Sequence, residues 1–409
     1  MSGSQRRSTN QQMYYENPKF FSSTHSCTKL CCDRCNKKCG KKDCVRCVNI
    51  CFQCPPKCFQ PCNTSELCMK KSVVTWKINY LVSNTPNQAA HMDPDLKNPW
   101  GIVVFNTQLW VSNNSSDKLT NYDLFGNKLL GSVNIRDSEH NSSNPTGLAI
   151  NCGGGFMISN DTITRPSRFL LSTEHGTVHG YNTNVEALDS FVVVNEQLKG
   201  NISTYKGIAV VNDTLYLANF SKRSIDVFDS NYVLQTNYPF VDGDTSEPIP
   251  QDFSPYNIVN IGRFLYVLWA RKDPKHLLHD ISGPGLGYIS VFNLDGSFVK
   301  RFASKGVLNS PWAMIPAPCE CGIPPDSFLV GNHGDGRINI FDCNGRFVGP
   351  LLNQNGLPIA IDGLHGLAPY YTSCSRGERF FSEIFFTSSI SDEYDGLLGS
   401  LVVDSIVDI

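Results

Sequence analysis

One short pattern recurs six times along the sequence and constrains the fold more than any other feature. It is a stretch of alternating apolar and polar residues that ends in an aromatic residue and an Asp or Asn. The five clear copies end at Tyr122-Asp123, Tyr181-Asn182, Phe228-Asp229, Phe292-Asn293 and Phe341-Asp342. A degraded sixth copy carries Leu401 at the aromatic position. The copies are 59, 47, 64, 49 and 60 residues apart. Such alternation predicts strands, and the repeat predicts several equivalent sheets.

An entry motif lies upstream of each copy, separated from it by an apolar strand. Its clear forms are Asn-Pro-Trp-Gly at 98–101, Asn-Pro-Thr-Gly at 144–147, Ser-Pro-Tyr-Asn at 254–257 and Ser-Pro-Trp-Ala at 310–313. Weaker forms occur at 205–207 and 364–366. Proline begins a strand where no ladder donor is needed, and glycine lets neighbouring backbones approach closely.

Six repeats of about four strands, without helical periodicity, predict an all-β fold, a six-bladed β-propeller. The alternating segment 74–82 precedes the first entry motif, so we expect this N-terminal strand to close the last blade. A solenoid is the second interpretation, but it needs capping repeats, which are not evident. The predicted organisation is a disordered N-terminus at 1–26, a small cysteine-rich basic head at 27–72 and the propeller at 73–409.

The motifs at 89–101, 331–342, 361–367 and 392–401 resemble, in this order, those of a family of uncharacterised β-propeller proteins found mainly in bacteria and often secreted. The resemblance covers about residues 78–402. It implies the fold but no activity, so function must be argued from the residues themselves.

Ligand-binding positions in a propeller usually lie where the inner strands begin, around the central channel. The repeat register predicts this role for Trp100, Asn144, Lys206, Tyr256, Asn257, Trp312 and Asp362. Aromatic, cationic and amide groups make a poor calcium cage and suit a flat polar ligand such as a sugar. The competing interpretation is that the aromatic residues only pack the blades.

A second set of residues suggests chemistry instead. His91 and Asp93 precede the first blade and His365 begins the sixth, so a closed ring can bring them together. Such a set can bind a metal, Zn or Ca, or supply a general base, as in a lactonase-like hydrolase or lyase. Coincidental turn residues and N-caps are the favoured explanation, so we expect no cofactor in the propeller. The segments 332–337 and 392–395 are interpreted as a hairpin turn and a solvated acidic loop.

Several classes of function find no support in the sequence. It contains no Gly-x-Ser-x-Gly elbow, Walker loop or dinucleotide fingerprint, which favours a non-catalytic protein. Residues 73–409 carry 22 Lys and Arg against 33 Asp and Glu, which argues against nucleic acid as a partner of the propeller. We also expect no transmembrane segment, since no run approaches about 18 apolar residues, and no ordinary secretory signal peptide.

The head is chemically different from the propeller. Residues 1–72 carry 13 Lys and Arg against 4 Asp and Glu. Twelve of the 17 cysteines lie there: Cys27, Cys31, Cys32, Cys35, Cys39, Cys44, Cys47, Cys51, Cys54, Cys58, Cys62 and Cys68. Their Cys-x2-Cys spacings suit zinc in a reducing compartment, whereas their even number suits disulfides in an oxidising one. A disordered tail with free thiols is the third possibility.

The Cys-, Pro- and Lys-rich segment 54–62 resembles the N-terminal segment of surface-fibril proteins of giant, amoeba-infecting viruses. That resemblance implies an anchoring head and a place on a virion or particle surface, with the cytoplasm as the alternative. The partners it implies are other coat or surface proteins and glycans, with self-association through head disulfides.

Overall fold

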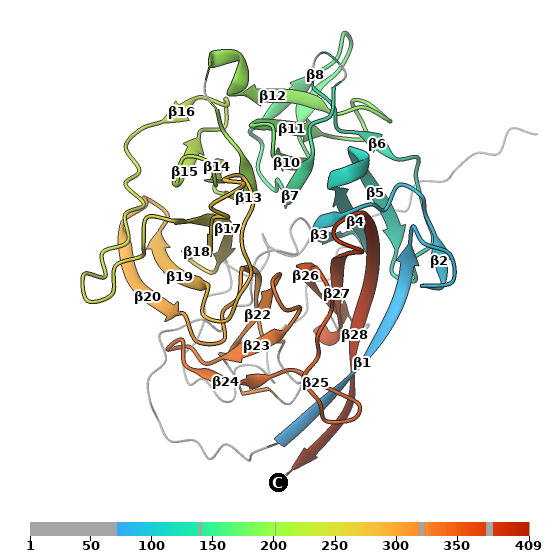
Figure 1. The fold of residues 1–409 in the computed structure, drawn as a ribbon. Coiled ribbons are helices and arrows are strands. Elements are labelled where there is room, and N and C mark those ends of the chain that lie inside the picture. Colours follow the sequence, from blue (N-terminus) through green and yellow to red (C-terminus); the bar gives the residue numbers. More distant parts are fainter. Residues whose placement is uncertain are drawn as a thin grey trace, which may run out of the picture. The chain divides into compact units, whose positions relative to one another are not determined.

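The computed structural model describes residues 72–408, except 138, 140, 201, 319–322, 325 and 374–378. In this range the chain forms six blades, each with four antiparallel strands, arranged around a central axis (Figure 1). The six-bladed propeller predicted from the repeat is confirmed. The twelve head cysteines lie outside the described residues, so the predictions for 1–26 and for the head stay predictions.

The first five blades follow the chain, and in each the first strand is the innermost. Blade 1 contains β3 (Pro99–Phe105), β4 (Gln108–Asn113), β5 (Lys118–Asp123) and β6 (Val133–Asn134). Blade 2 contains β7 (Pro145–Ile150), β10 (Phe169–Thr173), β11 (Thr177–Tyr181) and β12 (Phe191–Asn195). Blade 3 contains β13 (Tyr205–Val211), β14 (Thr214–Asn219), β15 (Ser224–Phe228) and β16 (Leu234–Gln235). Blade 4 contains β17 (Phe253–Ile261), β18 (Phe264–Arg271), β19 (Gly287–Asn293) and β20 (Phe298–Ser304). Blade 5 contains β21 (Pro311–Pro316), β22 (Phe328–Asn332), β23 (Ile338–Phe341) and β24 (Phe347–Pro350).

The sixth blade joins the two ends of the described chain. It contains β26 (Leu364–Ser373), β27 (Arg379–Ile390), β28 (Asp395–Asp408) and β1 (Ser72–Ser83). β1 runs antiparallel to β28, with Trp76 opposite Val403, and the two lie side by side in Figure 1. The predicted closure by an N-terminal strand is therefore confirmed, and because the ring closes, the solenoid interpretation is wrong.

A few short elements decorate the blades. They are β2 (His91–Met92) and β25 (Leu352–Asn353), which pair with β1, the hairpin β8 (Met157–Ser159) with β9 (Thr164–Pro166), and the 3-10 turns η1 (Asn114–Ser116) and η2 (Gln197–Lys199). None of the helical turns in the described part of the chain has the length and hydropathy of a membrane-spanning helix.

The repeated aromatic residue and the Asp that follows it have separate roles. The aromatic residues at the five clear copies are at most 3% exposed and pack in the core between neighbouring blades. The Asp stabilises the next turn, as shown by Asp123, whose Oδ1 accepts the backbone N–H groups of Phe125 and Asn127, both at 2.9 Å. Asp229 and Asp342 make the equivalent pairs of bonds. In these three blades the pattern therefore encodes one core position and one turn.

The entry motif is explained by crowding around the axis, where the inner strands of neighbouring blades contact one another. A Cβ atom added to Gly101 would lie 2.6 Å from the backbone nitrogen of Leu148 in the next blade. Asn98 and Asn144, each before a proline, have φ of 48° and 52°, a conformation that Asn tolerates better than most residues. Asn, Pro and Gly in the motif thus set the start and the close packing of each inner strand.

Candidate functional site

The centre of the propeller is filled by side chains from equivalent positions of different blades. The third residue of the entry motif is Trp100 in β3, Tyr256 in β17 and Trp312 in β21, and each is at most 5% exposed. Trp100 meets the other two edge to face, with ring centroids 6.1 and 6.0 Å apart. The same cluster includes Phe220. The propeller symmetry directs these side chains to one place, where they pack against one another.

Two histidines extend this central cluster. His365, at the equivalent position of β26, is fully buried and stacks on Trp100, with ring centroids 4.1 Å apart and planes 22° apart. It also stacks on His333, at 4.3 Å and 26°. The centroids of Trp100 and His333 are 6.5 Å apart, so the three rings contact one another in a bent arrangement with His365 at the corner.

A buried lysine carries a positive charge into the same cluster. Lys206 holds the equivalent position in β13 and is 2% exposed. Its Nζ forms an ion pair with Glu174 and lies 4.9 Å from the ring centre of Trp100, within range of a cation–π interaction. Buried charges of this kind need a partner, and the carboxylate of Glu174 supplies one.

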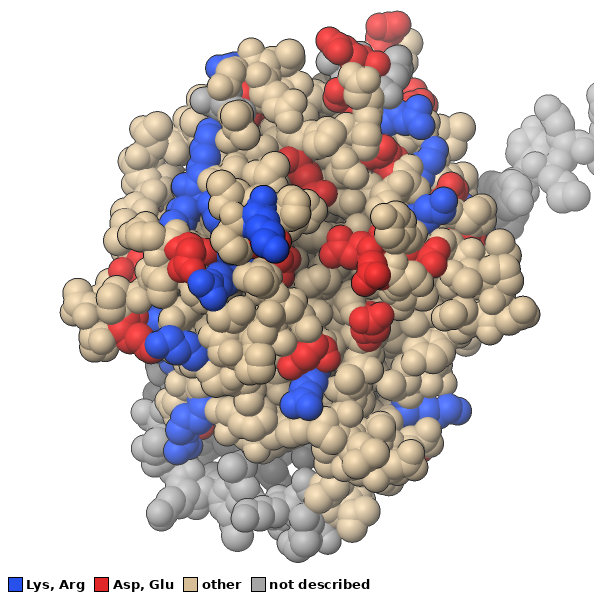
Figure 2. All heavy atoms as spheres, viewed as in Figure 1, with Lys and Arg blue, Asp and Glu red and all other residues tan. Residues whose placement is uncertain are grey.

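Acidic side chains surround the axis on the face where the inner strands begin. Figure 2 shows them around the hollow at the centre of this face. Glu174 follows β10, Asp280 lies between β18 and β19, and Glu393 lies in the turn between β27 and β28. Glu393 Oε1 lies 3.4 Å from His333 Nε2. The rim thus combines three carboxylates with an imidazole and the buried lysine.

The surroundings shift the pKa values of His333 and His365 in opposite directions. Burial lowers the pKa of His333, but the hydrogen bond that its ring donates to the Glu393 carboxylate and the charges of Asp280 and Glu393 outweigh this effect, so the pKa is raised. Burial, followed by the positive charges of His333 and Lys206, holds the pKa of His365 well below its usual range. His365 is therefore a neutral imidazole at physiological pH, and His333 is the more readily protonated of the pair.

Among the other predicted ligand-binding residues, two are used in structural contacts. Asn257 donates to the carbonyl of Trp312 at 2.7 Å, which links blades 4 and 5. Asn144 donates to the carbonyl of Asn114 at 3.3 Å, which links blades 2 and 1. Asp362 is exposed in the turn before β26. The structure therefore brings Trp100, Lys206, Tyr256 and Trp312 together, as the register suggests, and leaves the other three outside this cluster.

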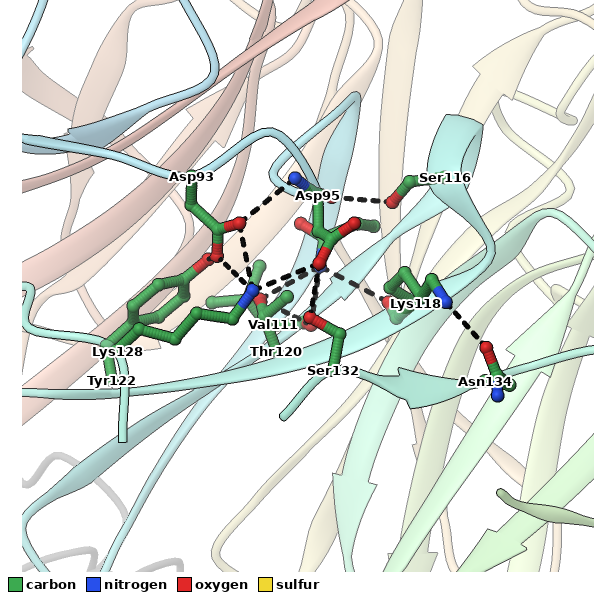
Figure 3. A network of polar contacts seen from close by, with 11 residues as sticks. Asp93, Asp95, Val111, Ser116, Lys118, Thr120, Tyr122, Lys128, Ser132 and Asn134 are labelled. Carbon is green, nitrogen blue, oxygen red and sulfur yellow. Dashed lines mark hydrogen bonds and ion pairs between the residues drawn. The ribbon is translucent and has the colours of Figure 1, made fainter. Parts of the chain in front are cut away.

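Asp93 belongs to a different network, at the outer part of blade 1 (Figure 3). Its carboxylate accepts from the Tyr122 hydroxyl at 2.7 Å, from Lys128 Nζ at 2.9 Å and from the backbone of Asp95 at 3.0 Å. These contacts tie the segment before blade 1 to β5 and its turn. They occupy the lone pairs that a general base or metal ligand needs.

His91 lies in the short strand β2, opposite Val82 of β1, and is partly exposed. Within the described residues, the one group of three or more metal-capable side chains with ligand atoms within 4.8 Å of one another is His333, His365 and Glu393. Of the predicted set His91, Asp93 and His365, only His365 belongs to it.

Sequence reasoning missed His333, Glu174, Asp280 and Glu393. The turns at 332–337 and 392–395 do have the predicted local form, but His333 and Glu393 also reach the channel. A signal for two of them was present in the repeat. Glu174 and His333 each follow directly the second strand of a blade, and this position lies beside the start of the inner strand in an antiparallel pair.

The fold and the central cluster together define a six-bladed β-propeller whose channel is filled by aromatic, imidazole and lysine side chains. Uncharacterized protein L690 of Acanthamoeba polyphaga mimivirus is 56% identical over 372 residues, covering 89% of this chain and 98% of that protein. Uncharacterized protein R648 of the same virus is 57% identical over 368 residues, covering 86% and 90%. The chain belongs to the family of these mimivirus proteins.

Other comparisons add the fold only. A crystal structure of a protein of unknown function from Bacteroides thetaiotaomicron is similar with a TM-score of 0.50 and 11% identity, covering 81% of this chain and 76% of that one. No family model matches the chain. The resemblance to bacterial propeller proteins and the resemblance of the head to viral fibril proteins therefore stay predictions.

Proposed function

We propose that this protein is a non-catalytic structural and binding component of a virus particle. The propeller is displayed on the particle surface, and the cysteine-rich head at 27–72 holds it there. Membership in a family of mimivirus proteins supports the viral setting. The composition of the head, rich in Cys, Pro and Lys, supports the anchoring role.

The state of the channel is the observation that carries the non-catalytic part of the proposal. A hydrolase or lyase of this fold needs space at the axis for a substrate and a reactive group. Here Trp100, Tyr256, Trp312 and His365 are at most 5% exposed because they cover one another. The residues best placed to line a substrate channel therefore act as a core between the blades.

Because the channel is filled, we expect a partner to bind at its rim and not inside it. The faces of Trp100 and Trp312 are not open platforms for a sugar, so a partner meets the rim of the hollow instead. Glu174, which pairs with Lys206, belongs to that rim, as do Asp280 and Glu393, whose charges act on His333. Such a charged, hollowed face suits a coat protein with basic side chains, or a glycan that hydrogen bonds to carboxylates.

A lactonase-like hydrolase built on His91, Asp93 and His365 gains no specific observation in its favour. The oxygens of Asp93 are engaged by Tyr122, Lys128 and the backbone of Asp95. His365 lies in the axial stack instead.

The proposal is tested on purified particles of the virus that encodes the chain. Antibodies raised against the full-length protein should label intact particles in immunogold electron microscopy, and protease treatment of intact particles should remove the signal. On gels, the protein should migrate in larger species without reductant and as a monomer with it. Absence of the protein from purified particles, or labelling only after particles are opened, would overturn the surface role.

A further inference from the structure

We propose that His333, His365 and Glu393 form a binding site for a divalent transition-metal cation of the zinc class at the mouth of the channel. This inference concerns the site itself and does not depend on the virion role. It differs from the sequence-based hypothesis, which joined His365 to His91 and Asp93.

The donor set suits such a cation. Two imidazoles and one carboxylate form a common three-ligand set for zinc, which keeps a fourth position for water or an external ligand. Here the three ligand atoms already lie within 4.8 Å of one another. They come from three separate places, namely the end of β22, the start of β26 and the turn between β27 and β28. A metal would thus join blade 5 to blade 6.

A chain of hydrogen bonds fixes the proton on His365. The indole of Trp100 can only donate, and its Nε1 lies 2.9 Å from the side-chain oxygen of Asn98. Ser389 Oγ donates to that same oxygen at 2.5 Å. With its proton used there, Ser389 Oγ accepts from Nδ1 of His365, at 3.0 Å. The proton of His365 is therefore on Nδ1, and Nε2 carries a lone pair.

That lone pair has no partner. Nε2 of His365 is buried and makes no hydrogen bond within the described part of the chain. The same holds for Nδ1 of His333. A buried polar atom without a partner costs about 1–3 kcal/mol, so two such nitrogens at one place indicate a missing ligand. Ser389 meanwhile plays the part that outer hydrogen bonds play in metal sites, since it holds the tautomer and ring orientation of His365.

The surrounding charges favour a dication. Glu174 and Asp280 join Glu393 at the rim, and of these Glu174 is balanced by Lys206. His333 stands beside Glu393, and a dication held between them would bring positive charge to these carboxylates.

The stacked rings define how the site must change on binding. A metal bound to an imidazole nitrogen lies near the plane of the ring, whereas His333 and His365 now stack at 26° with centroids 4.3 Å apart. One ring must therefore turn. His365 is held by Ser389 and Trp100, whereas the His333 side chain is 12% exposed and contacts Glu393 at the long distance of 3.4 Å. His333 is the ring that turns toward the metal.

The experiment uses the full-length chain and Co²⁺ as a spectroscopic probe for zinc. Cobalt bound by the head thiolates gives intense near-ultraviolet charge-transfer bands, whereas an imidazole and carboxylate site gives only visible d–d bands. We expect one site of the second kind per chain. Co²⁺ should also quench tryptophan fluorescence, because Trp100 stacks on His365.

Variants locate the site. His365→Ala should abolish the d–d bands and the quenching, and Ser389→Ala should weaken Co²⁺ binding about 10- to 100-fold. His276→Ala is the matched control, because its side chain is 71% exposed outside the cluster, and it should bind like the wild type.

Because His365 is buried, Glu393→Gln serves as a second variant, at a side chain that is 40% exposed. Thermal unfolding should be the same as for the wild type while Co²⁺ binding weakens. The proposal is overturned if the wild type shows no thiolate-independent d–d bands. Equal binding by the wild type, Glu393→Gln and Ser389→Ala would overturn it as well.

Discussion

Gly101 offers a test of the close packing that surrounds the channel. In the structure, a Cβ atom at Gly101 would lie 2.6 Å from the backbone nitrogen of Leu148, 2.8 Å from Leu148 Cβ and 2.8 Å from Ser112 Oγ. Ser112 is the side chain that donates to the Thr146 carbonyl of the next blade. Two of the three clashes involve backbone or Cβ atoms, so Gly101→Ala must push blades 1 and 2 apart.

The expected loss follows from these contacts. Overpacking of a well-packed core costs about 1–3 kcal/mol, and fixed backbone atoms place Gly101→Ala toward the upper part of that range. Unfolding entropy of about 2.1 cal/mol/K per residue gives roughly 0.7 kcal/mol/K for a propeller of about 330 residues. The unfolding temperature of Gly101→Ala should therefore fall by about 3–4 °C.

Gly154→Ala is the control, since a Cβ atom at Gly154 has nothing within 4 Å. Both substitutions restrict the unfolded chain equally, which by itself stabilises the folded state by about 0.4–1 kcal/mol. Thermal unfolding of the wild type and both variants, followed by circular dichroism, isolates the clash. If Gly101→Ala and Gly154→Ala unfold at the same temperature, the argument that the entry glycine serves close blade contact is refuted.

Three further predictions concern buried polar groups. Lys206→Met should lower the free energy of unfolding by about 2 kcal/mol, because Glu174, whose side chain is only 22% exposed, loses its cationic partner. Denaturant titration should show partial recovery in Lys206→Met/Glu174→Gln. Asp93→Ala should cost about 2–3 kcal/mol by the same titration, since the buried Tyr122 hydroxyl loses its acceptor and Lys128 keeps only its contact with Asp95. Unchanged stability would contradict the network of Figure 3. Burial lowers the pKa of His179 to about 3, so between pH 6.5 and 3 the unfolded chain binds the extra proton and stability falls as the pH falls. From pH 6.5 to 5 this amounts to about 1.6 kcal/mol, and denaturant midpoints of His179→Gln should depend less on pH over that range than those of the wild type.

Much of the fold could be predicted from the sequence because the same local pattern of strand and turn residues recurs along the chain. The aromatic residue and Asp of Tyr122-Asp123 sit at a core position and at a turn, and the pattern works through neighbours a few residues apart. The closing strand was predictable for a related reason. A ring whose last blade lacks one strand at the C-terminal end is completed by a strand from the N-terminal end.

The candidate site was predictable only in part. Trp100, Lys206, Tyr256, Trp312 and His365 share one register position, so the repeat alone brings them to the axis. Whether they line an open channel or fill it depends on the sizes of all the side chains that meet there, and the register does not contain that information.

The sequence by itself determined the number of blades, their order, the closing strand and the residues that begin each inner strand. Those properties follow from local strand and turn preferences repeated along the chain. Only the tertiary structure decided that Trp100, His365 and His333 form one stack, that Asp93 belongs to the outer network, and that Glu393 reaches the channel. These contacts join residues far apart in the chain, as does the bond between Thr387 and the Trp100 carbonyl, which spans 287 positions. Their partners are set by how the blades pack around the axis.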